Sequence, residues 1–176
     1  MTASLVLTIL GDDRPGLVDS LAGVISAHGA NWAESRMSRL AGKFAGILRI
    51  TVDDRRVNDL TRELEALNAA GLRVVVEPAG EPATMPAYTA LHLELVGQDH
   101  PGIVHDISHA LASLDINVAE FSSGVESASM AGGDLFRAEA RLMVPGTVSQ
   151  EQLRSLLENL ADELMVDIAL DPEPGS

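Results

Sequence analysis

Apolar and polar positions alternate in two short runs that lie 86 residues apart. Residues 5–10 read Leu-Val-Leu-Thr-Ile-Leu, and residues 91–96 read Leu-His-Leu-Glu-Leu-Val. A period of two is typical of a strand with one buried face, and the apolar spacing of three and four residues that follows each run predicts a one-sided helix. The apolar arcs of these helices are Leu17, Val18, Leu21, Val24 and Ile25, and Ile103, Val104, Ile107, Ala110, Leu111 and Leu114.

The remaining elements follow in the same order in both halves. Gly29 and Gly71 end the two helices of the first half. That half adds a hairpin of residues 31–40 and 44–52 that turns at Ala41-Gly42-Lys43, a helix capped by Asp53 or Asp54, and a strand over 72–77. The second half has strands near 88–96, 117–126, 134–144 and 163–170, and helices over 101–114 and 150–161, the latter with a capping box from Ser149 to Gln152.

Short motifs recur at the same offset and make the chain a tandem repeat. Gly-Asp-Asp-Arg-Pro-Gly at 11–16 corresponds to Gly-Gln-Asp-His-Pro-Gly at 97–102. Likewise, Asn-Trp-Ala-Glu at 31–34 corresponds to Asn-Val-Ala-Glu at 117–120. Because strand, turn, helix and motif agree in register, we interpret the chain as two copies of one module.

The module boundaries follow from this repeat. We expect modules over 1–77 and 88–170, joined by a linker over 78–87 that holds three prolines. The tail 171–176 is expected to be disordered, and the stretch 127–133 to be a long, mobile hairpin loop.

The order of elements in each module is β-α-β-β-α-β, which predicts an α+β fold. Two interlocked right-handed crossovers give the ferredoxin-like arrangement, a four-stranded antiparallel sheet with both helices on one face. With 46% hydrophobic residues but only 3% aromatic ones, the core must be aliphatic.

The charge and residue content exclude several classes of function. A net charge of −14 repels phosphate polyanions, so we expect no direct contact with nucleic acid. The chain has no cysteine and therefore no thiol nucleophile or thiolate metal site. No apolar run approaches the roughly 18 residues of a membrane helix, and the start shows no leader pattern, so we expect a cytoplasmic protein without membrane contact.

No catalytic pattern is present either. The sequence shows no nucleophile triad, phosphate loop or cofactor motif, so we expect neither an enzyme nor a bound cofactor. Acylphosphatases share this strand order, but their basic phosphate loop would here carry Asp12 and Asp13 beside Arg14. An RNA-binding sheet needs aromatic platforms and a basic face, which this chain lacks.

The turn between the first strand and helix of each module is the best candidate site. Pro15 and Pro101 suit the first helical position, where a missing amide is harmless, and Gly16 and Gly102 let a ligand approach the backbone. A helix N-terminus offers unpaired N–H groups and a partial positive charge. A small carboxylate is therefore the expected ligand.

Two pairs of polar residues complete this candidate site. Asn31 and Asn117 open the next strand, where each amide either bonds local backbone or contacts the carboxylate and ammonium groups of a ligand. For Asp13 and Asp99, capping of the helix is favoured over binding an ammonium group.

Several other residues that could bind a ligand or metal have simpler structural explanations. His105 and His109 have the spacing of a helical metal site, but both fall on the polar arc and no third ligand is suggested, so we expect no metal there. Trp32 is more typical of packing or an interface than of a ligand platform. Arg36 and Arg39 lie along an edge-like strand, facing solvent, a carboxylate or a partner protein.

Together, the repeated Asp-Arg-Pro-Gly and Asp-His-Pro-Gly turns and the strand-opening asparagines resemble the ACT domain, a small amino-acid-sensing module. The segments Gly11 to Val18, Asn31 with Glu34 to Met37, and Leu135 to Ala140 with Val144-Pro145 are similar to the glycine cleavage system transcriptional repressor family. That family consists of two ACT domains with neither a catalytic nor a DNA-binding domain.

The resemblance implies that an amino acid, with glycine or serine as candidates, binds at the seam between paired modules. The ligand-binding residues it implies are Asp13, Pro15, Gly16 and Asn31, and Asp99, Pro101, Gly102 and Asn117. It further implies a glycine-dependent protein partner, a DNA-binding transcriptional activator. A ligand-independent interaction protein or an enzyme-regulating protein with the same fold remains the alternative, and whether two chains form a homodimer stays open.

Overall fold

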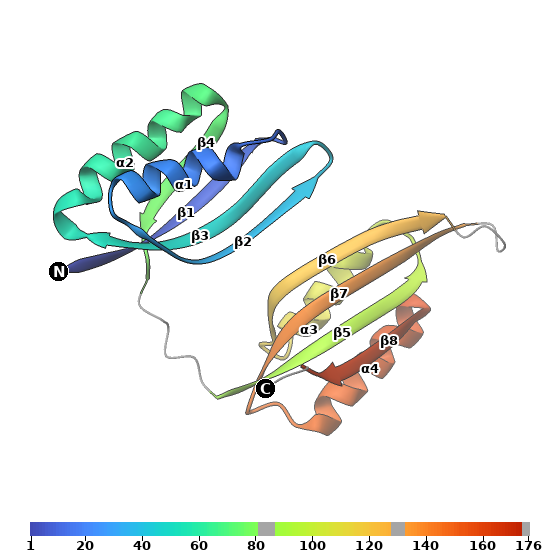
Figure 1. Ribbon diagram of the computed structural model, residues 1–176. Helices are drawn as coiled ribbons and strands as arrows, with labels where there is room; N and C mark the ends of the chain where they lie inside the picture. Colours follow the sequence, from blue (N-terminus) through green and yellow to red (C-terminus); the bar gives the residue numbers. More distant parts are fainter. Residues whose placement is uncertain (81–86, 128–132, 174–176) are drawn as a thin grey trace. The chain divides into compact units, whose positions relative to one another are not determined.

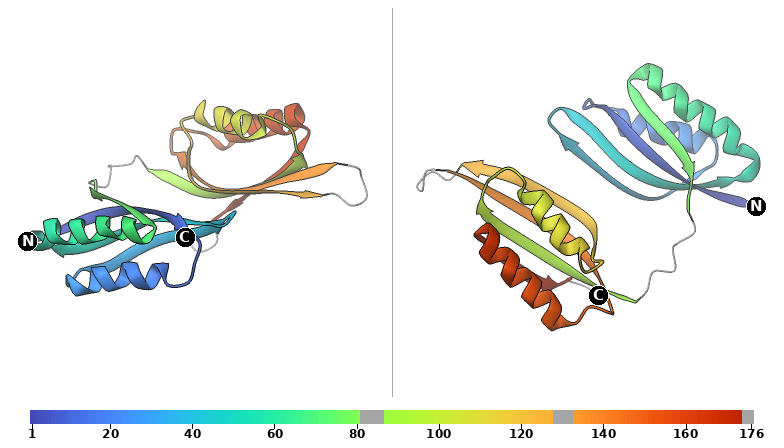
Figure 2. Two further views of the ribbon diagram at one scale, coloured as in Figure 1. Left: turned by 90° about the horizontal axis from the view of Figure 1, so that it is seen from above. Right: turned by 180° about the vertical axis from the view of Figure 1, so that it is seen from behind.

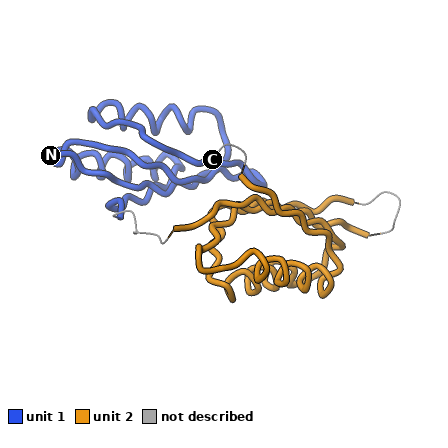
Figure 3. Tube along the Cα trace, turned by 90° about the horizontal axis from the view of Figure 1, so that it is seen from below, with its two compact units in different colours: residues 1–83 blue, residues 84–176 orange. Residues whose placement is uncertain are grey.

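The structure is a computed structural model that describes residues 1–80, 87–127 and 133–173. The chain divides into two compact units, residues 1–83 and residues 84–176 (Figure 3). The division falls inside the segment expected to be the linker, where residues 81–86 lie outside the described part. Each unit has its own sheet and its own hydrophobic core.

Both modules have the order β-α-β-β-α-β (Figure 1). The first consists of β1 (Thr2–Asp12), α1 (Leu17–Ala27), β2 (Asn31–Leu40), β3 (Lys43–Asp53), α2 (Val57–Ala66) and β4 (Leu72–Pro78), with 3-10 turns η1 (Asp54–Arg56) and η2 (Leu67–Ala70) flanking α2. The second consists of β5 (Tyr88–Gln98), α3 (Ile103–Ala112), β6 (Asn117–Ser127), β7 (Asp134–Pro145), α4 (Gln150–Leu164) and β8 (Val166–Pro172).

Each module contains one antiparallel sheet of four strands. The strand orders are β2-β3-β1-β4 and β6-β7-β5-β8, so the two halves have the same topology. The helices of a module lie together on one face of its sheet, and the other face carries no helix of that module (Figures 1 and 2). The predicted α+β, ferredoxin-like fold is confirmed.

Aliphatic side chains fill the space between each sheet and its helices. In the first module Leu7 and Leu21 are fully buried. In the second module Leu95 of β5 is also fully buried and corresponds to Ile9 of β1. The helical arcs were predicted too wide, because Val18 is 46% and Val104 is 40% exposed. At 100° per residue these valines lie on the flank of their helices, beyond the edge that contacts the sheet.

The turns that the sequence predicted are largely confirmed. Ala41 and Gly42 both have positive φ, 49° and 77°, which is the two-residue hairpin turn that matches the twist of the strands. Gly29 and Gly71 have φ of 63° and 84° just after their helices. Asp53 caps the 3-10 turn η1 instead of an α-helix, and its side chain accepts a hydrogen bond from the Arg55 amide at 3.0 Å.

The end of the second module differs from the prediction. Helix α4 continues to Leu164, so the expected strand over 163–170 begins too early. Leu164 is buried and extends the stripe of Leu153, Leu157 and Leu160, and Met165 ends the helix with a φ of 53°. The capping box at its start is present as predicted.

Two expected mobile segments fall largely outside the described residues. Strand β8 runs to Pro172, so the expected disorder of 171–176 is wrong for residues 171 and 172, while 174–176 lie outside the described part. Of the expected loop over 127–133, residues 128–132 also lie outside it.

Gly11 sets how closely the β1–α1 turn approaches strand β4. A Cβ atom at Gly11 would lie 2.8 Å from the carbonyl oxygen of Gly71, and one at Gly97 would lie 2.3 Å from Cγ1 of Val166. The chain therefore needs glycine at the same place in both modules, a requirement that comes from tertiary contact and not from turn conformation.

We expect Gly11→Ala to destabilise the protein by roughly 1–3 kcal/mol, because the new methyl group meets backbone that cannot move aside. Urea unfolding followed by circular dichroism measures this change. Gly124→Ala is the matched control, since a Cβ there has no neighbour within 4 Å. Equal stability of the two variants would contradict the close approach.

Candidate functional site

The β1–α1 turn of the first module is held to the hairpin by two ion pairs. Lys43 donates a hydrogen bond to the Asp12 carboxylate, and Arg39 Nη1 donates to Asp13 Oδ2 at 3.3 Å. The Asp13 amide donates to the carbonyl of Gly42 at 2.9 Å. The hydrogen bond and charge of Lys43 hold the pKa of Asp12 below its usual value. The turn is thus braced by β2 and β3.

Glycines, not aspartates, occupy the N-cap positions of the two following helices. Gly16 has φ 89° and Gly102 has φ 94°, a left-handed conformation that side chains disfavour. The predicted capping by Asp13 and Asp99 is wrong. The prolines precede the N-cap and are not the first helical residues, so that prediction is wrong as well. No side chain among the described residues caps either helix.

The uncapped ends give both turns a similar chemical character. The first helical hydrogen bonds run from Ser20 to the Gly16 carbonyl at 2.9 Å and from Asp106 to the Gly102 carbonyl at 3.0 Å. In the second module the Ile103 amide also donates to the His100 carbonyl at 3.4 Å. The other amides of the first turn of each helix are available to an anion, which the helix dipole also favours.

The two turns nevertheless differ in their charged neighbours. Arg14 donates to the carbonyl of Ala70, so its guanidinium is bonded to the end of η2, two residues before β4. At the corresponding position, Nδ1 of the His100 side chain lies 3.3 Å from the carbonyl of the adjacent Pro101. Asp106 Oδ2 would lie 3.9 Å from a Cβ at Gly102, where the first module has Ser20. The second turn therefore has a carboxylate beside it that would attract an ammonium group.

Asn31 and Asn117 open β2 and β6 as predicted, and both are exposed. The sheet register places Asn31 opposite Thr51, which pairs in turn with Ser4. The turn follows Asp12, eight positions farther along β1, or about 27 Å at the rise of a strand. Within one module the structure therefore does not bring the asparagine and the turn together.

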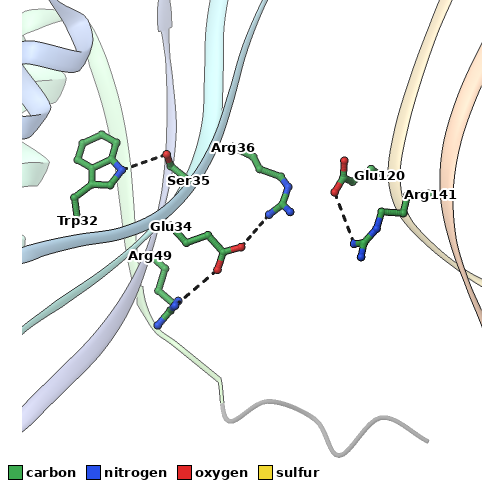
Figure 4. Close-up of polar contacts among 7 residues, drawn as sticks. All are labelled: Trp32, Glu34, Ser35, Arg36, Arg49, Glu120 and Arg141. Atoms are coloured by element: carbon green, nitrogen blue, oxygen red, sulfur yellow. Dashed lines mark hydrogen bonds and ion pairs between the residues drawn. The ribbon is translucent and has the colours of Figure 1, made fainter. Parts of the chain in front are cut away.

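The glutamates that end the two Asn-x-Ala-Glu motifs form cross-strand ion pairs (Figure 4). Glu34 accepts a hydrogen bond from Arg36 at 3.1 Å and lies 3.7 Å from Arg49. In the other module Arg141 Nη1 lies 3.8 Å from Glu120 Oε1. A β-bulge precedes each glutamate. The repeated motif thus has a structural basis in the edge strand, and no local pattern indicated this role of the glutamates.

The structure also places Trp32 and the histidine pair of α3. Trp32 packs against the core, and its Nε1 donates to Ser35 at 3.2 Å (Figure 4). The rings of His105 and His109 are exposed and stacked at 6.0 Å. Over residues 1–80, 87–127 and 133–173 there is no group of three or more side chains suited to a metal ion. Within the same ranges, no helix has the length and hydropathy to span a membrane.

Comparison with known proteins identifies the class. Residues 3–77 match the ACT domain family, so the first module is an ACT domain. The second module has the same topology and is ACT-like. The chain is therefore a tandem of ACT-like modules.

More narrowly, the chain is similar to the glycine cleavage system transcriptional repressor. It is 23% identical to the repressor of Escherichia coli (strain K12) over 163 residues, which cover 91% of this chain and 85% of that protein. It is also 26% identical over 160 residues to the bifunctional uridylyltransferase/uridylyl-removing enzyme of Gluconobacter oxydans (strain 621H). That match covers 74% of this chain but only 16% of the enzyme, so the chain spans a small part of that relative.

Solved structures agree over nearly the whole chain. A protein of unknown function from Galdieria sulphuraria aligns with a TM-score of 0.87 at 28% identity, covering 98% of this chain and 99% of the other. A crystal structure assigned as a glycine cleavage system transcriptional repressor aligns with a TM-score of 0.70 at 19% identity, covering 97% of both chains. The second likeness shows the shared fold.

We expect the Lys43→Ala variant to raise the pKa of Asp12 toward its ordinary value, because the hydrogen bond and charge that favour the carboxylate are lost. A carbon-13 NMR titration of the aspartate side chains measures this shift. Arg62→Ala, which removes the 3.6 Å ion pair with Asp59 elsewhere in the module, is the control and leaves Asp12 unchanged. An Asp12 titration that is the same in all three proteins would show that the brace does not form in solution.

Proposed function

We propose that the chain is a non-catalytic regulatory protein that senses a small amino acid and acts through a protein partner. The observation that supports this most is the pair of uncapped helix N-termini behind Gly16 and Gly102, in a protein homologous to a transcriptional repressor. Glycine and serine are the candidate effectors, as the resemblance to the repressor family implies.

The chemistry of the turns suits an amino acid. The carboxylate of the ligand accepts hydrogen bonds from the free amides that follow Gly16 or Gly102. Asp13 and Asp99 border these turns, and Pro15 and Pro101 fix the backbone that leads into them. The ammonium group needs an acceptor, which the amide oxygens of Asn31 and Asn117 provide.

The register of the sheet adds a condition to this proposal. Because about 27 Å of strand β1 separates the register position of Asn31 from the turn, one ligand cannot contact both within the first module. A ligand that contacts both would couple amino-acid binding to the association of modules, as in a homodimer. Such coupling is the physical requirement of a sensor, since the ligand then favours one arrangement over another.

The proposed partner is a DNA-binding transcriptional activator in the cytoplasm, and the regulated genes are those of the glycine cleavage system. A net charge of −14 disfavours contact with DNA and favours a basic protein surface. An activator that must bind DNA carries such a surface. The chain would thus repress by holding the activator and not by occupying the promoter.

A second candidate function is an interaction protein that has kept the fold and does not respond to a ligand. The first turn supports it, because Asp12, Asp13 and Arg14 all have partners inside the module. A ligand there would rely on backbone amides alone. The match to part of a uridylyltransferase keeps regulation of an enzyme as a variant of this alternative.

We expect glycine or serine to bind with a calorimetric signal that Asn31→Ala and Asn117→Ala each weaken at least tenfold, about 1.4 kcal/mol, at the pocket concerned. Both side chains are exposed, so the melting temperature stays the same. Asn58→Ala, an exposed asparagine on α2, is the matched control and keeps full affinity. Absence of heat for all twenty amino acids at millimolar concentration would rule out sensing and leave the ligand-independent candidate.

The partner is tested by a gel-shift assay with a glycine cleavage promoter. We expect the chain alone to leave the DNA unshifted and to change the shift produced by the activator in a glycine-dependent way. A change that is the same with and without glycine would support the ligand-independent candidate. A direct shift of the DNA by the chain would contradict the role assigned to its charge.

A further inference from the structure

In each module a wedge-shaped space lies between the first helix and the two outer strands, α1 with β2 and β3 or α3 with β6 and β7. This wedge is filled differently in the two modules. In the first, Trp32 and Met37 from β2 and Leu48 from β3 pack into it against the core. The Met37 side chain lies close over Gly46, because a Cβ atom added at Gly46 would be only 2.7 Å from the Met37 Cγ. Three large apolar side chains therefore close this side of the first module.

The register identifies the corresponding positions in the second module without ambiguity. Each sheet has one bulge at the same place, directly after Trp32 in β2 and directly after Val118 in β6. Counting from the bulge, Met37 corresponds to Ser123, and the residue opposite, Gly46, to Ala138. In the same way Leu48 corresponds to Ala140, and Ser35 to Phe121.

All three large side chains are thus replaced by smaller ones, while Phe121 in place of Ser35 and Ala138 in place of Gly46 add volume. The helix does not compensate, because Ile103, Ile107 and Leu111 of α3 match Leu17, Leu21 and Ile25 of α1 in size. Packing that is complete in one module must therefore leave space in the other.

A cavity of about 200 Å³ occupies this space in the second module. Its wall includes Leu93, Ile107, Leu111, Val118, Phe121 and Ala140. Val104 and Phe121 are 40% and 44% exposed and border its opening to solvent. Among the described residues that line it, Ser108 is the only polar one, and its hydroxyl donates to the Val104 carbonyl at 2.6 Å. Apolar cavities of about 150 Å³ are known to take up benzene.

We propose that the second module binds a free, uncharged aromatic ring of about the size of indole in this cavity. The first module supplies the template, because its own indole, that of Trp32, fills the corresponding wedge. The apolar wall gives no compensation to a charged group, so the ring that enters must be neutral. Neither the turn at 99–102 nor Asn117 lines the cavity, so this site is separate from the proposed amino-acid site.

The test is a titration of the nitrogen-15-labelled full chain with indole, followed by NMR. We expect saturable binding of one indole with a dissociation constant of about 1 mM or lower. The shifts should include the amides of Ile107, Val118 and Ala140. Val118→Trp and Ala140→Leu, which restore the residues of the first module, should each weaken binding at least tenfold.

Val125→Trp is the matched control, because Val125 lies on the same strand, is 53% exposed and does not line the cavity. It should keep the affinity of the unmodified chain, and thermal melting should show that all three variants fold. If Val118→Trp does not fold, Ala140→Leu carries the test. Lack of saturation up to about 10 mM indole, or equal affinity in the folded filling variants, would overturn the proposal. Glycine binding should be unchanged in these variants, which separates this outcome from that of the proposed function.

Discussion

Burial of aliphatic side chains between one face of a four-stranded sheet and two helices is the constraint on which each module depends. Without aromatic bulk, the layers must approach closely, and Gly11 and Gly97 allow this where the first strand passes the start of the last. The same approach requires a sharp turn into the helix, which Gly16 and Gly102 provide with positive φ. The uncapped amides of the candidate site are thus a consequence of core packing.

On the face of each sheet opposite the helices, ion pairs join neighbouring strands. Cross-strand pairs such as Glu34 with Arg49 and Glu120 with Arg141 recur in both modules, at the same register. Exposed pairs of this kind contribute little to stability, typically less than about 1 kcal/mol, but like charges in their place would be unfavourable. Their main effect is to fix which residues face outward on a strongly acidic protein.

Duplication followed by divergence explains why the two modules differ at their turns and outer strands, which a ligand or partner would contact. The core positions of β1 and β5 and of α1 and α3 stay close in size, because any change there is felt by the whole layer. The outer strands, with fewer neighbours, have changed from Trp32 to Val118 and from Met37 to Ser123. The turns have also diverged, since Arg14 bonds the distant carbonyl of Ala70, whereas His100 lies against the carbonyl of the adjacent Pro101. Two copies of one fold can therefore offer chemically distinct sites.

Local patterns along the chain were enough to predict the repeat, the order of elements, the hairpin turn at Ala41-Gly42 and the strands that begin at Asn31 and Asn117, because periodicity and turn chemistry are local properties. They placed the candidate turns correctly but misjudged their caps, since whether Asp13 caps a helix or pairs with Arg39 depends on a hairpin that arrives from elsewhere. The separation of turn and asparagine, the extension of α4 to Leu164 and the cavity beside Val118 became visible in the folded chain. Each of these is set by register and packing between segments distant in the chain, which no local pattern encodes.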